Sequence, residues 1–228
     1  MRPHLLSLGA LMLSACTVLT PPPRALPLET VSPVGEGRTG EQFTFAKDTS
    51  GVDVDTGAVS LRHGFDPDTD VNVEATGWTL PSYEKDAGNS RQRVWSGHAG
   101  AKRRVARFLA LEAGVGGGGI AGTPFVGPDA AVIVAWENRF VVPFLALRGV
   151  ASVPVHATIV RPGDDSSKLL PELYGQLALG GRVPIGWTAP RPGQLRGSLL
   201  GGAGWTWYGD VRNSGRIDGF AFGAEITF

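Results

Sequence analysis

The sequence predicts an all-β chain, folded as an antiparallel up-and-down barrel of about 8–10 strands. Composition is the first reason. Glycine accounts for 33 of the 228 residues, proline for 17 and charged residues for 18%, and glycine and proline weaken helix interiors and favour turns and tight sheet packing. Alternation is the second reason, because apolar and polar residues alternate with a period of two in about ten short stretches, and no helical period competes with it.

Length and charge limit the classes of function. A chain of 228 residues is long enough for one domain with a sizeable core. Its 21 basic and 21 acidic residues give a formal net charge of zero, so we expect no nucleic-acid partner. The single cysteine excludes an internal disulfide and a cysteine-based zinc site. We therefore expect no metal and no cofactor.

The first 40 residues predict an export signal followed by a tether. Residues 1–15 have the features of a signal peptide, with Arg2 before an apolar stretch from residue 5 to residue 13 that is too short to span a bilayer. Residues 16–40 contain three consecutive prolines at 21–23 and show no apolar periodicity, as in a proline-rich tether. The barrel domain is then expected over residues 41–228.

The run Leu13-Ser14-Ala15-Cys16 resembles the lipobox of bacterial lipoproteins. This resemblance implies that signal peptidase II cleaves before Cys16 and that lipoprotein-processing enzymes attach acyl chains there, which would hold the mature N-terminus in a membrane. Thr17 stands where many lipoproteins retained in the inner membrane carry aspartate. The resemblance therefore favours the outer membrane. An ordinary secretory peptide that happens to contain a cysteine is the alternative.

Alternation defines the expected strands. The clearest stretch is 70–77, where Asp70, Asn72, Glu74 and Thr76 alternate with apolar residues or glycine. The expected strands are 42–46, 58–64, 70–77, 91–100, 106–115, 130–136, 140–149, 169–180, 194–208 and 216–228. The connections 65–70, 101–106 and 137–139 would be short turns at one end, and 79–90, 116–129 and 150–168 long ones at the other, as is usual in membrane barrels. The connection 181–193 departs from this rule, and eight strands remain possible.

The polar faces carry charges of both signs and little lysine. In the lumen of a small barrel such charges are tolerated only when they pair, so a lumen network of ion pairs is expected, and it would plug the barrel. Its expected members are Arg62, Asp70, Glu74, Glu112, Arg148, Glu172, Arg196 and Glu225. A solvated strand face is the alternative interpretation of the same residues.

Aromatic residues stand at the ends of several stretches, where an aromatic girdle meets the lipid–water interface. The expected lipid-facing girdle contains Trp78, Trp136, Trp205, Trp207 and Tyr208. The final strand ends in Phe228, which resembles the C-terminal signature of outer-membrane β-barrels. The resemblance implies outer-membrane lipid and the barrel-assembly machinery as partners.

Alternation alone does not decide which face is buried. A soluble envelope lipoprotein with a lipocalin-like or sandwich body that binds an apolar ligand would show the same pattern. The two classes differ in whether the apolar faces of the strands point to lipid or to a protein interior. Residues that report this are Leu177, Leu199, Phe220, Phe222 and Ile226.

Catalytic motifs are weak. A cell-envelope hydrolase is a third possibility, but His63, His98 and His156 accompany no Gly-x-Ser-x-Gly elbow, so we expect no catalytic residues. The acidic stretch 66–77 lacks the glycine and glutamate of an EF-hand. The glycine run 114–119 lacks the residues of a P-loop and is expected to be a flexible loop. The basic stretch 102–104, with Arg107, is expected to form a solvated corner, and contact with anionic lipid headgroups is the alternative.

The sequence thus favours an outer-membrane barrel lipoprotein that is not an enzyme. Its role would be structural, interactive or the passage of a small solute. The sequence does not identify a substrate, a ligand or a partner protein.

Overall fold

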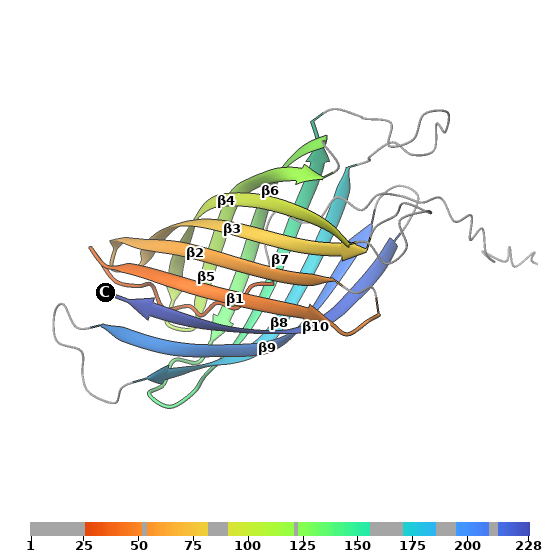
Figure 1. The fold of residues 1–228 in the computed structure, drawn as a ribbon. Coiled ribbons are helices and arrows are strands. Elements are labelled where there is room, and N and C mark those ends of the chain that lie inside the picture. The colour runs from red at the N-terminus through yellow and green to blue at the C-terminus, as the bar shows by residue number, and fades with distance from the viewer. Residues whose placement is uncertain are drawn as a thin grey trace, which may run out of the picture.

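The computed structural model describes residues 26–51, 54–81, 91–120, 123–155, 171–185, 195–209 and 214–228. They form one closed antiparallel barrel in which each strand pairs with its neighbours in the chain (Figure 1). The strands are β1 (Thr39–Asp48), β2 (Asp55–Asp66), β3 (Thr69–Pro81), β4 (Arg91–Ala106), β5 (Leu109–Ile120), β6 (Thr123–Ala135), β7 (Val142–Pro154), β8 (Glu172–Ile185), β9 (Arg196–Gly209) and β10 (Ser214–Thr227). The predicted all-β antiparallel barrel is confirmed, with ten strands. No helix in these ranges is long and apolar enough to cross a membrane.

The barrel closes where β1 pairs with β10. The Thr39 N–H donates to the Phe228 carbonyl at 3.0 Å, and the Phe228 N–H donates to the Thr39 carbonyl at 2.9 Å. The start of β1 and the end of β10 therefore lie at the same end of the barrel, which we call the proximal end. The opposite end, where β1 connects to β2, is the distal end.

Two of the expected connections are wrong. The turn predicted at 101–106 belongs to β4, and the chain reverses only between Ala106 and Leu109. The loop predicted at 116–129 is largely strand, because the glycine run continues β5 as far as Ile120. Glycine is needed there for close approach, since a Cβ at Gly118 would lie 2.2 Å from the Trp95 carbonyl oxygen. The run is a place where strands pack tightly.

The proximal turn between β2 and β3 is fixed by aspartates. The Asp68 N–H donates to Asp66 Oδ1 at 2.8 Å, and this hydrogen bond is the main reason that the pKa of the Asp66 carboxyl is lowered. The Arg104 N–H donates to the Asp68 carbonyl at 2.8 Å, which joins this turn to the end of β4.

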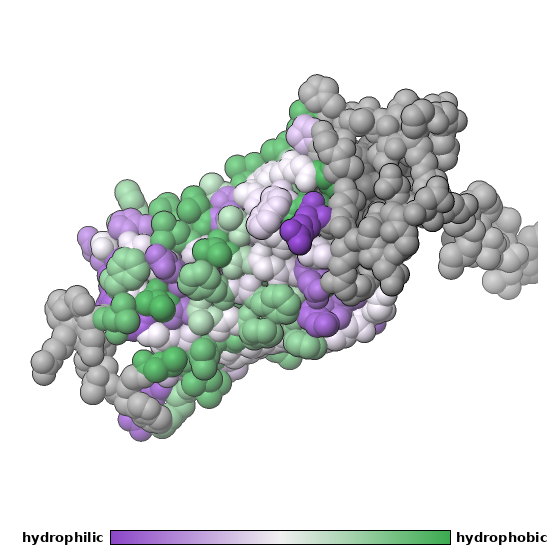
Figure 2. All heavy atoms as spheres, in the orientation of Figure 1, coloured by the Kyte–Doolittle hydropathy of each residue, from purple (hydrophilic) through white to green (hydrophobic). Residues whose placement is uncertain are grey.

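The barrel has an apolar outside, and its inside holds charged and polar side chains together with two apolar clusters. Phe222 and Leu199 are each 54% exposed on the outer wall, whereas Arg148 is 1% exposed and Asp70 is fully buried. Among the reporting residues, Phe220 and Ile226 are also exposed and Leu177 is partly exposed. Figure 2 shows hydrophobic side chains across the visible wall, with hydrophilic ones gathered mostly toward the two ends. A sandwich body is excluded, and the apolar faces of the strands do not form the interior.

Candidate functional site: the filled lumen

Inward-facing positions alternate along each strand and bring charges from distant parts of the chain together. Arg62 on β2 and Glu225 on β10 form an ion pair of 2.9 Å between Arg62 Nη2 and Glu225 Oε2. Both side chains are buried. Because β1 lies between these two strands, the pair crosses the inner face of β1 near the seam that closes the barrel.

Arg148 on β7 is the centre of a second group. Its Nη2 lies 3.4 Å from Glu112 Oε2 and 3.6 Å from Glu29 Oε1, and its Nε lies 4.0 Å from Asp129 Oδ1. Asn72 donates from its amide to Glu112 Oε1 at 2.7 Å. A guanidinium with five donors suits such a cluster, since it contacts several carboxylates at once.

Lys102 on β4 joins this group to the N-terminal part of the chain. Its Nζ lies 3.6 Å from Asp70 Oδ2 and 3.8 Å from Glu29 Oε2, and it donates to the Thr30 carbonyl at 3.2 Å. Its side chain is 1% exposed. The solvated corner expected at 102–104 is therefore wrong for Lys102, because the alternation of β4 turns this position inward.

Residues 26–38, which we call the inner segment, were expected to belong to the tether. Residues 26–34 lie within the lumen, and Glu36 and Gly37 are exposed at the proximal end, where the segment pairs with Gly64 of β2. Leu28 and Val31 are buried. The Leu28 carbonyl accepts from Gln42 Nε2 at 3.0 Å, and the Val34 N–H donates to Asp70 Oδ1 at 3.1 Å. Composition did not reveal this, because a segment without periodicity resembles a tether whether it lies in water or inside a barrel.

The inner segment runs from the middle of the lumen to the proximal end. Leu26 lies against Gly204 of β9, where a Cβ would come 2.6 Å from Leu26 Cδ2, and Val34 lies against Gly40 at the start of β1. Leu28 and Val31 belong to an apolar cluster with inward-facing wall residues. The wall residues of this cluster are Ala46, Ala110, Ile133, Ala135, Val142, Phe144, Ala146, Ala178, Leu200 and Ala221.

The distal end has its own buried groups. A second apolar cluster contains Val54, Trp78, Val94, Ile120 and Phe125, with Ile217 packed against it. On the inner face of β8, also at the distal end, Tyr174 donates from its hydroxyl to Glu172. The Tyr174 ring centroid lies 6.4 Å from that of Tyr208 on β9. Side chains therefore occupy the lumen at both ends as well as in the middle.

A buried histidine contacts one of the carboxylates. His98 Nε2 lies 2.7 Å from Asp129 Oδ2, and neither side chain is exposed. The ring packs on two glycines, since a Cβ at Gly114 would lie 2.2 Å from His98 Nε2 and one at Gly100 would lie 2.8 Å from His98 Cε1. The spacing of histidines gave no sign of this pair; the alternation of β4 and β6, combined with their pairing to β5, places the two residues on one face.

Most of the expected lumen residues lie inside the barrel. Six of the eight are buried, namely Arg62, Asp70, Glu112, Arg148, Glu172 and Glu225. Glu74 is half-buried and accepts from the Thr76 hydroxyl at 2.9 Å. Arg196 stands apart, because it begins β9 at the proximal rim and its side chain is exposed. Lys102, His98, Asp129 and Glu29 were not among the expected members.

Three of the five residues expected in the aromatic girdle lie on the outer wall. Trp136 is 71% exposed and Trp207 is 43% exposed, both on the outer wall, and Trp205 is partly exposed on the same face as Trp207. Trp78 and Tyr208 are corrections. Trp78 has the inward parity of Thr76 and donates to the Ser96 hydroxyl at 3.3 Å, and Tyr208 shares the inward parity of Thr206.

The position of an aromatic residue at the end of a stretch does not determine whether its ring points outward, because strand parity decides this. Trp95, which was not predicted, is 69% exposed on the outside of β4. Phe228 is 49% exposed. Cys16 and His156 lie outside the described residues.

Comparisons with known proteins add little. No protein-family model and no curated protein matches the chain. Two of the solved structures to which the chain is similar are of variants of the ferric enterobactin receptor PfeA from Pseudomonas aeruginosa. One is 13% identical over 78% of this chain and 32% of that chain, with a TM-score of 0.29. The other is 12% identical over 76% and 31%, with a TM-score of 0.27. The chain spans about a third of the length of these receptors, and likeness at this level identifies neither a family nor a function.

The chemistry of the described lumen is that of paired, dehydrated charges. No group of three histidine, cysteine, aspartate or glutamate side chains within the described ranges is arranged to hold a metal ion. Buried ion pairs at these distances are costly to break singly. The arrangement can therefore fix the inner segment in place and fill the barrel.

Proposed function

We propose that the protein is an outer-membrane β-barrel lipoprotein with a structural or interaction role, and that its lumen is closed by the inner segment and the paired charges. The observation that carries the proposal is that large apolar side chains cover the outer wall while charged side chains are buried in the lumen. A soluble barrel would place its apolar side chains inside, whereas a barrel in lipid needs them outside, with every backbone group paired in a closed ladder.

The outer apolar band has the height that a bilayer requires. On β4, Arg93 and Arg103 both have outward parity, and between them only Trp95, Gly97, Ala99 and Ala101 do. Ten residues of strand span about 33 Å, and a tilt of about 45° reduces this to roughly 23 Å along the membrane normal. This matches the apolar band of about 25 Å seen on outer-membrane barrels.

Closure of the lumen supports a structural or interaction role over an open pore. The inner segment passes through the proximal half, and apolar side chains gather at the distal end. Passage of a small solute would need the inner segment to move. Its removal is therefore the experiment that separates the two roles.

The lipid anchor belongs to the same proposal. The lipobox ending in Cys16 supports acylation of that residue, and Phe228 at the end of an outward-apolar strand supports recognition by the barrel-assembly machinery. Metabolic labelling with a palmitate analogue tests the anchor: the unaltered protein should incorporate label and Cys16→Ser should not. Label in the Cys16→Ser protein would refute it.

The barrel itself is tested by electrophoresis of membrane fractions. A closed transmembrane ladder keeps its shape in cold SDS, so the unboiled protein should migrate differently from the boiled one and should resist alkaline extraction. Equal mobility, with release into the supernatant at alkaline pH, would contradict the membrane location.

Planar-bilayer conductance then tests closure. The unaltered protein should show no steady conductance, and deletion of residues 26–36 should open a path through the lumen. A deletion variant with a heat-dependent mobility shift but no conductance would show that wall side chains alone close the barrel. Steady conductance of the unaltered protein would instead support solute passage.

A further inference from the structure

One part of the outer wall is hollowed between aromatic side chains. A row of outward residues runs across five paired strands: Phe222 on β10 pairs with Phe45 on β1, which pairs with Gly57 on β2, then with Gly77 on β3 and Trp95 on β4. Large side chains stand at the ends of this row and two glycines lie in its middle. The surface is therefore depressed over Gly57 on β2, where a Cβ would meet no atom within 4 Å.

The depression is a groove of about 770 Å³, within the size range of small-molecule sites. Phe45 and Phe222 form one wall, with ring centroids 5.4 Å apart. The Trp95 ring forms the other, and it leans over Gly77, where a Cβ would lie 2.9 Å from its Cζ3 atom. Phe43 and Val59 border the groove toward the proximal end.

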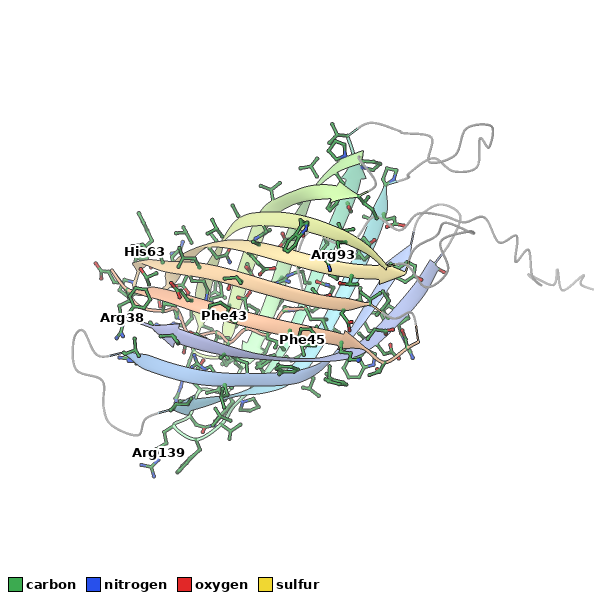
Figure 3. The ribbon with its side chains drawn as sticks, in the orientation of Figure 1. Arg38, Phe43, Phe45, His63, Arg93 and Arg139 are labelled. Atoms are coloured by element: carbon green, nitrogen blue, oxygen red, sulfur yellow. The ribbon has the colours of Figure 1, made fainter. Side chains whose placement is uncertain are left out.

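Charged residues border the groove toward the distal end. The next outward row contains Lys47, Asp55, Thr79 and Arg93, in register across β1 to β4. The Lys47 and Arg93 side chains are exposed, and Arg93 and Thr79 line the groove. Figure 3 shows Phe43, Phe45 and Arg93 on the same side of the barrel. Two cations against one carboxylate leave this border with a positive charge.

We propose that this groove binds one acyl chain of an anionic phospholipid, with the chain over Gly57 and against the Trp95 ring, and the headgroup phosphate at Arg93 and Lys47. The apolar floor and aromatic walls suit a methylene chain, and an arginine at the interface supplies a charge-assisted hydrogen bond to phosphate. The site rests on the proposed membrane location, because only a barrel in a bilayer presents its outer wall to lipid chains.

A matched pair of glycine variants tests the floor of the groove. Gly57 and Gly149 both face outward, and a Cβ at either meets no atom within 4 Å, so neither substitution disturbs packing at that atom. Gly57→Leu fills the groove, whereas Gly149→Leu adds the same side chain on β7. Lipid binding to the detergent-solubilised full chain is measured by native mass spectrometry, with phosphatidylglycerol and phosphatidylcholine of identical chains as probes.

Gly57→Leu should raise the dissociation constant for phosphatidylglycerol about tenfold, because the leucine side chain occupies the space of the acyl chain. Gly149→Leu should leave the dissociation constant unchanged. Arg93→Gln should reduce binding of phosphatidylglycerol to the level of phosphatidylcholine, with Arg103→Gln, at the other end of β4, as its control. Equal effects of the two glycine variants would overturn the groove. Equal binding of both lipids by the unaltered protein would overturn the headgroup site.

Failure of this proposal is distinguishable from failure of the proposed function. A protein that shows the heat-dependent mobility shift and resists alkaline extraction, yet binds lipid equally well as Gly57→Leu and as Gly149→Leu, is a membrane barrel without this site. A protein without the shift lacks the membrane location itself.

Discussion

Arg62 and Glu225 belong to strands that do not pair with each other, and their ion pair of 2.9 Å bridges β2 and β10 over the inner face of β1. β1 is the strand that closes the barrel. A charge-assisted contact at this place holds together the two strands that flank β1.

Removal of one partner should be more harmful than removal of both. Arg62→Met leaves the Glu225 carboxylate buried without its cation and should lower the free energy of unfolding by about 3–5 kcal/mol. The double variant Arg62→Met/Glu225→Leu should recover most of this loss, because no unpaired charge remains. Unfolding in urea, followed in detergent micelles by tryptophan fluorescence, measures both.

An exposed pair on the same barrel provides the control. Arg104 and Asp68 lie 2.6 Å apart at the proximal rim, with side chains 37% and 52% exposed. Arg104→Met should cost less than about 1 kcal/mol because water screens this pair. A cost for Arg62→Met as small as that for Arg104→Met would contradict a dehydrated pair in the lumen.

Lys102 should control whether the inner segment stays in the lumen. Its ammonium group contacts the Thr30 and Ser32 carbonyls as well as Asp70. Lys102→Met removes these contacts and leaves Asp70 and Glu29 facing each other without this cation. We expect the segment to leave the lumen for a larger fraction of the time.

A cysteine at position 31 reports this movement. Val31 is fully buried, so in a Cys16→Ser background Val31→Cys should react slowly with a polar maleimide, and addition of Lys102→Met should accelerate the reaction about tenfold or more. Arg104→Met serves as the matched control and should leave the rate unchanged. Rapid labelling without Lys102→Met would show that the lumen does not hold the segment.

The same substitution, glycine to alanine, should have different effects on stability at Gly127 and at Gly149. A Cβ at Gly127 on β6 would lie 1.5 Å from the Ala151 carbonyl oxygen of β7, and one at Gly149 would meet nothing within 4 Å. Gly127→Ala must move backbone and should cost about 1–3 kcal/mol, whereas Gly149→Ala should change stability by less than about 0.5 kcal/mol. Thermal unfolding of the two variants in one detergent compares them directly, and a neutral Gly127→Ala would contradict the close approach of β6 and β7.

Alternation in the sequence was sufficient for the strands and for most of the inner face. Arg62 and Glu112 have polar or small neighbours two positions away, Arg148 has an alanine and a valine, and strand parity alone turns all three charged residues to the same side. The period of two does not reveal which strands come close, so the glycine run in β5 resembled a loop. Only its pairing with β4 and β6 shows why glycine is needed.

The lumen was harder to predict where it depends on contacts distant in sequence. The inner segment has no periodicity of its own, and its place is set by Gln42, Lys102 and Asp70, which lie on three different strands. Lys102 resembled a corner residue because two arginines follow it directly in the sequence. Trp78 and Tyr208 resembled girdle residues because they end apolar stretches, although their parity turns them inward.

Tryptophan quenching by brominated lipid should separate Trp78 from Trp95, two residues that pair with neighbouring positions on β3 and β4. Trp95 pairs with Gly77 and points to the outside, 69% exposed, whereas Trp78 pairs with Val94 and is buried in the distal apolar cluster. Two variants are compared in vesicles, each retaining one of these tryptophans with all others replaced by phenylalanine. Bromine on the acyl chains should quench the protein that retains Trp95 and leave the one that retains Trp78 bright, because quenching requires near contact. If both are quenched equally, the inner and outer faces of β3 and β4 are not as the structure has them; if neither is quenched, the outer wall does not meet lipid.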